Sequence, residues 1–205
     1  MLDFGYYNMD CMQGMKEFPD NYFDLAIVDP PYGINCTSFG ALRKYKTDTE
    51  WDKSVPDNSY FKELFRVSKN QIIWGGNYYN LPPAKCFLIW DKKQPEGVSF
   101  ASCEFAWTSF EKGVAKTFYY SPFSDTDKRI HATQKPVALY EWILNRYAKD
   151  GDIILDTHVG SASSLIACHR TNHKFVGFEL DEEYYKKSSE RLKNETNQMT
   201  IYNLL

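Results

Sequence analysis

The sequence lacks several features that mark particular classes of protein. No run of about 18 apolar residues occurs, so we expect no membrane-spanning helix. The first ten residues, MLDFGYYNMD, contain no basic segment followed by an apolar one, so we expect no signal peptide. The five cysteines are widely scattered without a Cys-x-x-Cys pair, which predicts reduced thiols, a cytoplasmic location and no metal site.

Two common phosphate-binding patterns are also absent. The chain contains neither Gly-x-Gly-x-x-Gly nor a glycine-rich loop ending in Lys-Ser or Lys-Thr, which argues against dinucleotides and nucleoside triphosphates as ligands. The formal net charge is only -3. Residues 33–130 hold 14 Lys and Arg against 11 Asp and Glu, whereas the remainder holds 10 against 16. A mildly basic middle between acidic ends is compatible with a DNA-facing insert on a catalytic core.

Aromatic side chains, by contrast, are abundant. Phe, Trp and Tyr make up 17% of the chain, including 15 Tyr and 14 Phe. Such rings fill hydrophobic cores, and they also provide stacking surfaces for nucleic-acid bases. With 205 residues, the chain is long enough for one domain with a core of its own.

The two ends of the chain alternate predicted strands and predicted helices. Residues 24–29, 153–156 and 174–179 are short apolar runs that predict buried strands. Residues 136–148 begin with Pro, and residues 181–193 begin with three acids; both features favour the first turn of a helix. This alternation predicts an α/β fold with an open, mostly parallel twisted sheet and helices on both faces.

The middle of the chain has a different pattern. Residues 33–56 show no convincing element and many Lys, Thr and Asp, which predicts a long mobile loop. We expect a single domain over residues 1–205, with a small insert within residues 33–130. In this region the sequence predicts a helix at residues 57–68 and aromatic, β-rich segments at residues 71–74, 86–90, 103–108 and 115–120.

The tetrapeptide Asp29-Pro30-Pro31-Tyr32 follows the first of these buried strands. Ligands of open α/β sheets bind at the carboxyl ends of strands. The two prolines fix the backbone and remove two N–H donors, so the carbonyls there remain as acceptors. A carboxylate, a rigid carbonyl and an aromatic ring suit a planar group bearing an NH2, because the oxygens accept its hydrogens and the ring stacks on its face. A strand-ending turn with an ordinary surface Tyr is the structural alternative.

Three further clusters follow predicted strands or precede a helix. In residues 156–163 small side chains let a ligand approach the backbone, and Asp156 can receive an ammonium group. About 20 residues further on, Glu179 ends the next strand, where an acid commonly accepts the ribose hydroxyls of an adenosine-type cofactor. Asp181 can equally cap the following helix. Residues 131–136 place polar groups before a helix, although capping by Thr133 explains that pattern as well.

Together these clusters resemble the DNA amino-methyltransferases, in the class whose catalytic motif precedes the cofactor motif. Asp29-Pro30-Pro31-Tyr32 resembles their catalytic motif. Residues 131–136 are similar to their His-Pro-Thr-Gln-Lys-Pro signature, with Ala132 in place of Pro. Residues 156–163 resemble their Asp-Pro-Phe-x-Gly-Ser-Gly-Thr loop, with departures at Thr157, His158, Ala162 and Ser163. Residues 7–11, 90–92, 103–108 and 175–191 also match family segments, so the resemblance spans nearly the whole chain.

The resemblance implies a Rossmann-like methyltransferase fold, S-adenosylmethionine as cofactor and DNA as substrate. It implies methyl transfer to the exocyclic amine of a flipped-out base, with Asp29, Pro30, Pro31 and Tyr32 as catalytic residues. It favours the N6 amine of adenine, because the cytosine-specific members more often have Ser where this chain has Asp29. The residues implied for the cofactor are Asp10, Cys11, Asp29, Thr133, Lys135, Asp156, Thr157, His158, Gly160, Ser161, Ala162, Glu179, Leu180 and Asp181.

Several alternatives remain open at this point. One is methylation of the N4 amine of cytosine. Another is an inactive, DNA-binding subunit with the methyltransferase fold, which the altered cofactor loop motivates. Methylation of RNA or of a protein glutamine fits less well, because those enzymes often have Asn at the first catalytic position. A plain nucleotide-binding module leaves residues 29–32 and 131–136 unexplained. The resemblance places a reduced DNA-recognition region within residues 33–130, and so short a region would suit a homodimer in which each subunit helps the other to hold DNA.

Overall fold

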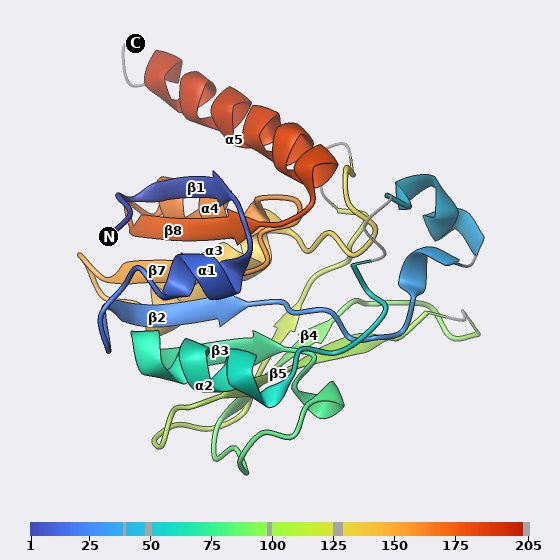
Figure 1. The fold of residues 1–205 in the computed structure, drawn as a ribbon. Coiled ribbons are helices and arrows are strands. Elements are labelled where there is room, and N and C mark those ends of the chain that lie inside the picture. Colours follow the sequence, from blue (N-terminus) through green and yellow to red (C-terminus); the bar gives the residue numbers. More distant parts are fainter. Residues whose placement is uncertain (39, 48–50, 98–99, 125–128, 203–205) are drawn as a thin grey trace.

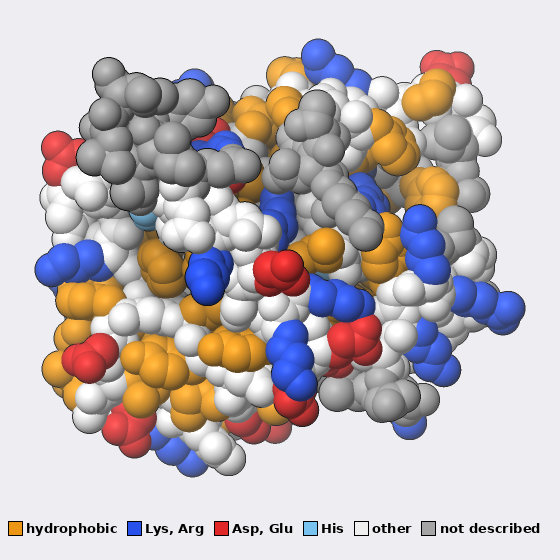
Figure 2. Space-filling model, turned by 90° about the horizontal axis from the view of Figure 1, so that it is seen from above, with side chains coloured by type: hydrophobic (Ala, Val, Ile, Leu, Met, Phe, Trp, Pro, Cys, Tyr) orange, Lys and Arg blue, Asp and Glu red, His pale blue; other side chains and the backbone are white. Residues whose placement is uncertain are grey.

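In a computed structural model, which describes residues 1–38, 40–47, 51–97, 100–124 and 129–202, the chain forms a sheet of eight strands flanked by helices (Figure 1). Within these ranges, no helix combines the length and the apolar character that crossing a membrane requires. Among the described side chains, the face seen from above carries basic, acidic and hydrophobic groups interspersed with one another (Figure 2).

The sheet has the strand order β1-β8-β7-β2-β3-β5-β4-β6. Neighbouring strands from β1 to β3 are parallel, whereas β5 runs antiparallel to both β3 and β4, and β6 is parallel to β4. The predicted open, mostly parallel sheet is therefore confirmed. The strands are β1 (Gly5–Asn8), β2 (Phe23–Val28), β3 (Ser68–Trp74), β4 (Phe87–Asp91), β5 (Cys103–Thr108), β6 (Lys116–Tyr119), β7 (Ile153–Asp156) and β8 (Lys174–Glu179).

Helices cover both faces of the sheet, as predicted. Side chains alternate across β2, so Leu25 and Ile27 pack on one face while Ala26 and Val28 pack on the other. The first face lies under α3 and α4, and the second lies under α1 and α2. Each buried Leu, Ile or Phe side chain contributes roughly 1.5–3 kcal/mol to this packing. The helices are α1 (Cys11–Met15), α2 (Asn58–Val67), α3 (Val137–Tyr147), α4 (Ser163–Arg170) and α5 (Glu182–Tyr202).

Three of the helices begin at an aspartate. The Asp10 carboxylate accepts the backbone N–H of Met12 at 2.7 Å and caps α1. The Asp57 carboxylate accepts the backbone N–H groups of Ser59 and Tyr60 and so caps α2. Asp181 accepts the N–H groups of Glu183 and Tyr184, each at 2.9 Å, and caps α5. The capping role that the sequence suggested for Asp181 is therefore confirmed.

Residues 33–56 differ from the prediction of a loop without regular elements. They contain two short 3-10 helices, η1 (Cys36–Ser38) and η2 (Gly40–Tyr45). Asp52 is buried, and its carboxylate accepts the N–H groups of Tyr32, Gly33 and Cys36 at 2.9–3.0 Å. The prediction was wrong here because this long-range capping by one carboxylate leaves no periodic pattern in the sequence. Residues 39 and 48–50 lie outside the described residues.

Gly14 on α1 allows that short helix to approach β8 closely. A Cβ atom at this position would lie 2.4 Å from two ring carbons of Phe178, which is fully buried. Gly14→Ala should lower the free energy of unfolding by about 2 kcal/mol, because overpacking outweighs the better helix propensity of Ala. Urea denaturation measures this change. Gln13→Ala on the exposed side of α1 is the control, and equal stability of the two variants would contradict the close approach.

Candidate active site

A cavity of about 510 Å³ lies at the carboxyl ends of β1, β2, β7 and β8. Parallel strands present their carboxyl ends at the same edge of a sheet, which is where open α/β sheets bind ligands. All but two of the residues predicted to hold a cofactor line this cavity. They are Asp10, Cys11, Asp29, Thr133, Lys135, Thr157, His158, Gly160, Ser161, Glu179, Leu180 and Asp181.

Glu179 links two walls of the cavity. Its carboxylate accepts the N–H of Gly160 at 2.8 Å and the N–H of Asp181 at 2.9 Å. These bonds fix the turn after β7 to the end of β8, and the remaining lone pairs are available to a ligand. Burial raises the pKa of Glu179 to about 7, against the two backbone hydrogen bonds, which lower it.

Asp156 and Ala162 are the two predicted cofactor residues that the structure does not place on the cavity wall. The carboxylate of Asp156 accepts the N–H of His158 at 3.0 Å and the hydroxyl of Ser164. It therefore stabilises the turn between β7 and α4 from the side away from the cavity. Ala162 is fully buried, and its φ of 62° is in the left-handed region that favours glycine. The resembled family has its second loop glycine at this position. Ala in place of Gly therefore strains the backbone at a left-handed φ and leaves the cavity wall unchanged.

Residues 51–60 form a wall of the cavity that the sequence analysis missed. Trp51 and Tyr60 both line it. The ring of Trp51 packs on His131, with centroids 5.0 Å apart, and His131 packs in turn on Tyr184 at 4.2 Å. The hydroxyl of Tyr60 lies 2.6 Å from the Thr157 hydroxyl. A tryptophan in a polar segment directly before the predicted helix at residues 57–68 was the available signal.

Two histidines of the cavity are held as neutral rings. Burial lowers the pKa of His131 to about 3, and the nearby Lys135 ammonium adds to this effect. Burial likewise lowers the pKa of His158 to about 4. Near neutral pH the cavity therefore receives no positive charge from either imidazole.

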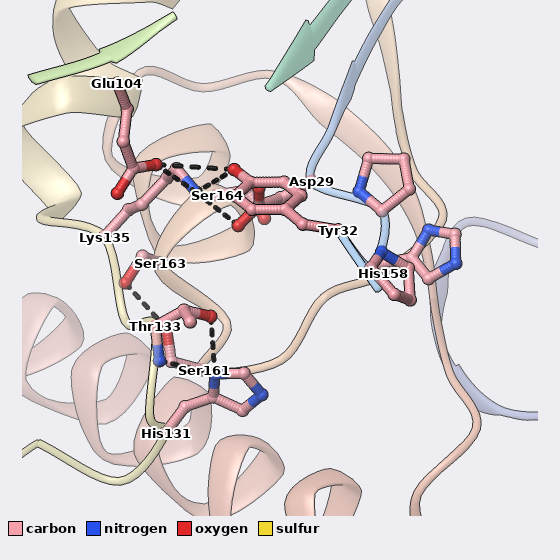
Figure 3. Close-up of polar contacts among 12 residues, drawn as sticks. Asp29, Tyr32, Glu104, His131, Thr133, Lys135, His158, Ser161, Ser163 and Ser164 are labelled. Atoms are coloured by element: carbon pink, nitrogen blue, oxygen red, sulfur yellow. Dashed lines mark hydrogen bonds and ion pairs between the residues drawn. The ribbon is translucent and has the colours of Figure 1, made fainter. Parts of the chain in front are cut away.

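Asp29 follows the last residue of β2 and borders the same cavity. Its Oδ1 accepts the hydroxyl of Tyr32 at 2.7 Å, and its Oδ2 is ion-paired with Nζ of Lys135 (Figure 3). Lys135 is almost completely buried, with 1% of its side chain exposed, and it also contacts Glu104 at 3.0 Å. The segment before α3 and strand β5 thus both supply groups to the carboxylate at the end of β2.

The charges around Asp29 oppose one another. Burial raises the pKa of Asp29 and Glu104 raises it further, while the Lys135 ammonium works in the opposite direction; the net shift is upward. Burial also acts to raise the pKa of Glu104, but its two lysine partners, Lys135 and Lys92, more than offset this and lower that pKa to about 2. The pKa of Lys135 is raised by Asp29 and Glu104, despite burial, which acts to lower it.

The ring of Tyr32 stacks on Tyr78, with centroids 4.8 Å apart and planes 14° from parallel. Gly75 makes room for it, because a Cβ atom there would lie 2.2 Å from a ring carbon of Tyr32. The hydroxyl of Tyr79 donates to the carbonyl of Pro30 at 2.7 Å, so this predicted acceptor retains one lone pair. Beside Pro31, a second hollow of about 20 Å³ is lined by Tyr32, Ile34 and Trp51, among others. It has room for about one water molecule.

Comparisons with known proteins agree on one family. A family model described as DNA methylase matches residues 89–190. The type II methyltransferase M.HpaI of Haemophilus parainfluenzae is 35% identical to this chain, over 92% of the chain and 74% of that protein.

Two solved structures share the fold. The complex of M1.HpyAVI with S-adenosylmethionine superposes with a TM-score of 0.63 at 20% identity, over 91% of this chain and 98% of that one. The PvuII DNA methyltransferase, described as specific for cytosine N4, superposes with a TM-score of 0.63 at 14% identity, over 95% of this chain and 91% of that one. Taken with the family model and with the identity to M.HpaI, the arrangement of residues 29–32 beside the cavity leads to one conclusion: the chain belongs to the N6/N4 family of DNA methylases, whose methyl donor is S-adenosylmethionine.

Proposed function

We propose that this protein transfers the methyl group of S-adenosylmethionine to the N6 amine of adenine in DNA, after the base has flipped out of the duplex. The observation that carries the proposal is the position of Asp29. Its carboxylate borders the 510 Å³ cavity and also accepts a hydrogen bond from the Tyr32 hydroxyl. One carboxylate can therefore face both the bound methyl donor and a stacked base. An in-stack amine could not reach this position, which is why base flipping is required.

Different residues of the cavity are assigned to different parts of the cofactor. We assign its adenine to the neighbourhood of Asp10 and Cys11, its ribose to Glu179, and its amino-acid end to the region of His158 and Lys135. These groups surround one continuous space, so they fit an elongated molecule. The bound cofactor supplies an electrophilic methyl group on a sulfonium centre.

At the catalytic end, the chain supplies acceptors and a stacking ring. The Asp29 carboxylate and the Pro30 carbonyl accept the two hydrogens of the amine, and Tyr32 stacks on the base. These hydrogen bonds favour a tetrahedral nitrogen whose lone pair points at the methyl group, and they stabilise the positive charge that develops on nitrogen. Holding the two reacting atoms in line supplies much of the remaining acceleration.

The base assignment rests on Asp29. The resembled family more often has Ser at this position in its cytosine-specific members, so Asp favours adenine. Cytosine N4 presents an amine of the same shape to the same acceptors, and the fold of a cytosine-N4-specific enzyme is shared. Cytosine is therefore the competing substrate that the experiment has to separate.

The first test identifies the methylated base. Purified protein, labelled S-adenosylmethionine and unmethylated duplex DNA are incubated together, and the DNA is digested to nucleosides for chromatography. We expect the label on N6-methyl-2′-deoxyadenosine. Label on the cytosine amine would retain the mechanism and overturn the base assignment, whereas cofactor binding without any labelled nucleoside would contradict activity on DNA.

The second test removes the catalytic carboxylate. Asp29→Ala should lower the single-turnover rate at least about 10²–10³-fold, because one preorganised hydrogen-bonding group at the developing charge is lost. Isothermal titration should show cofactor affinity largely retained, since the other walls of the cavity remain. Asp20→Ala changes an exposed carboxylate away from the cavity and should keep the wild-type rate. Near wild-type turnover in Asp29→Ala would exclude this mechanism.

The third test uses the raised pKa of Glu179, which is about 7 because of burial. Its carboxylate is more fully ionised above this value and then accepts ribose hydroxyls more strongly, so the dissociation constant of the cofactor should fall between pH 6 and pH 8. Glu179→Gln should bind more weakly and lose this part of the pH dependence. The α-amino group of the ligand titrates in the same range, with a pKa of about 8, and comparing the variant with the wild type cancels its effect.

Glu182→Gln, which changes an exposed acid on α5, is the matched control for this test. It should follow the wild-type pH profile. If the cofactor dissociation constant of Glu179→Gln depended on pH as in the wild type, Glu179 would not be a ligand of the ribose.

A further inference from the structure

Glu104 on β5 lies next to the catalytic carboxylate but lines neither cavity. Its Oε1 is 2.7 Å from Nζ of Lys92, and its Oε2 is 3.0 Å from Nζ of Lys135. Only 18% of its side chain is exposed. The family resemblance includes its segment, residues 103–108, but neither the resemblance nor the proposed reaction gives Glu104 a role.

Glu104 shares its donors with Asp29. The hydroxyl of Tyr32 donates to Asp29 at 2.7 Å and lies 3.4 Å from Oε2 of Glu104. The ammonium group of Lys135 contacts both carboxylates (Figure 3). The two groups that occupy the oxygens of Asp29 can therefore each be received by the same oxygen of Glu104.

The charges in this cluster alternate in sign. Lys92, Glu104, Lys135 and Asp29 form a row of cation, anion, cation and anion. A buried ammonium group that loses its partner carries a large desolvation penalty, so Lys135 holds tightly to any carboxylate within reach. If Asp29 were the only such carboxylate, Lys135 would compete directly with the substrate amine for it.

We propose that Glu104 is a positioning residue for methyl transfer, acting as the alternative acceptor for Tyr32 and Lys135 when the target amine binds to Asp29. The inference rests on the proposed function, because it assumes that an amine binds there. On binding, the Tyr32 hydroxyl passes to Glu104 and Lys135 shifts its contact toward Glu104. The oxygens of Asp29 are then directed at the hydrogens of the amine. No covalent bond forms or breaks in this exchange.

The exchange predicts opposite effects of two substitutions on the acid limb of the pH–rate profile. The charged and titratable groups facing Asp29 are Lys135, Glu104, Tyr32, Tyr79, Tyr140 and Asp156. Glu104→Gln removes a negative charge that raises the pKa of Asp29, so the acid limb should move to lower pH. Lys92→Met leaves the charge of Glu104 less balanced, so the acid limb should move to higher pH.

The experiment measures single-turnover methylation across pH, together with cofactor affinity and melting temperature. Glu104→Gln should lower the plateau rate by about tenfold or more, the rate equivalent of one charged hydrogen bond, with cofactor affinity unchanged. Glu63→Gln is the matched control, because Glu63 is equally exposed at 18% and ion-paired with Arg66 on α2, away from the cavity. It should keep the wild-type rate.

A double-mutant cycle with Tyr32→Phe separates this role from a merely structural one. Phe keeps the stacking ring but has no hydroxyl to transfer, so the penalty of Glu104→Gln should be smaller in that background. Additive penalties, a wild-type rate in Glu104→Gln, or shifts of the acid limb in the same direction for both charge variants would overturn the proposal.

If Glu104→Gln does not fold, the direction of the shift of the acid limb in Lys92→Met still tests the proposal. A wild-type protein that methylates no DNA would overturn the proposed function as well, whereas an active wild type with an equally active Glu104→Gln overturns this inference alone.

Discussion

The ion pairs of the buried Lys135 ammonium group are the interactions on which the proposed catalytic end of this molecule depends. It joins Asp29 at the end of β2 to Glu104 on β5, and it comes from the segment that leads into α3. It is the cation paired with Asp29, it shares Glu104 with Lys92, and its own burial is offset by these two carboxylates. Three parts of the chain, separated by as many as 106 positions in the sequence, must therefore be folded together before Asp29 is correctly placed.

Different strands of the sheet supply the cavity and the contacts of Lys135. The parallel strands β1, β8, β7 and β2 end at the cavity and supply the groups assigned to the methyl donor. Antiparallel pairing begins between β3 and β5, and β5 places Glu104 near Asp29. Asp29 follows β2, which lies between β7 and β3. Its carboxylate therefore borders the cavity and also contacts the Lys135 ammonium that Glu104 shares.

The sequence predicted those parts whose cause is local. Apolar runs placed β2, β7 and β8, the prolines after Asp29 indicated a rigid turn, and the spacing to Glu179 indicated an acid at the next strand end. Features that depend on tertiary contacts could not be predicted in this way. Asp156 does not line the cavity, because its carboxylate accepts the hydroxyl of Ser164 and the N–H of His158. The wall formed by residues 51–60 and the ion pairs of Glu104 likewise arise from tertiary contacts that no short motif records.

The three hydrogen bonds accepted by Asp52 have a mechanical consequence. One side chain fastens the backbone of Tyr32 and Gly33 to a segment about 20 positions further on, and the adjacent Trp51 forms part of the cavity wall. The wall at Trp51 and the turn that carries Tyr32 therefore cannot be displaced independently without breaking these hydrogen bonds. One buried carboxylate thus sets the spacing between a wall of the cavity and the backbone that follows Asp29.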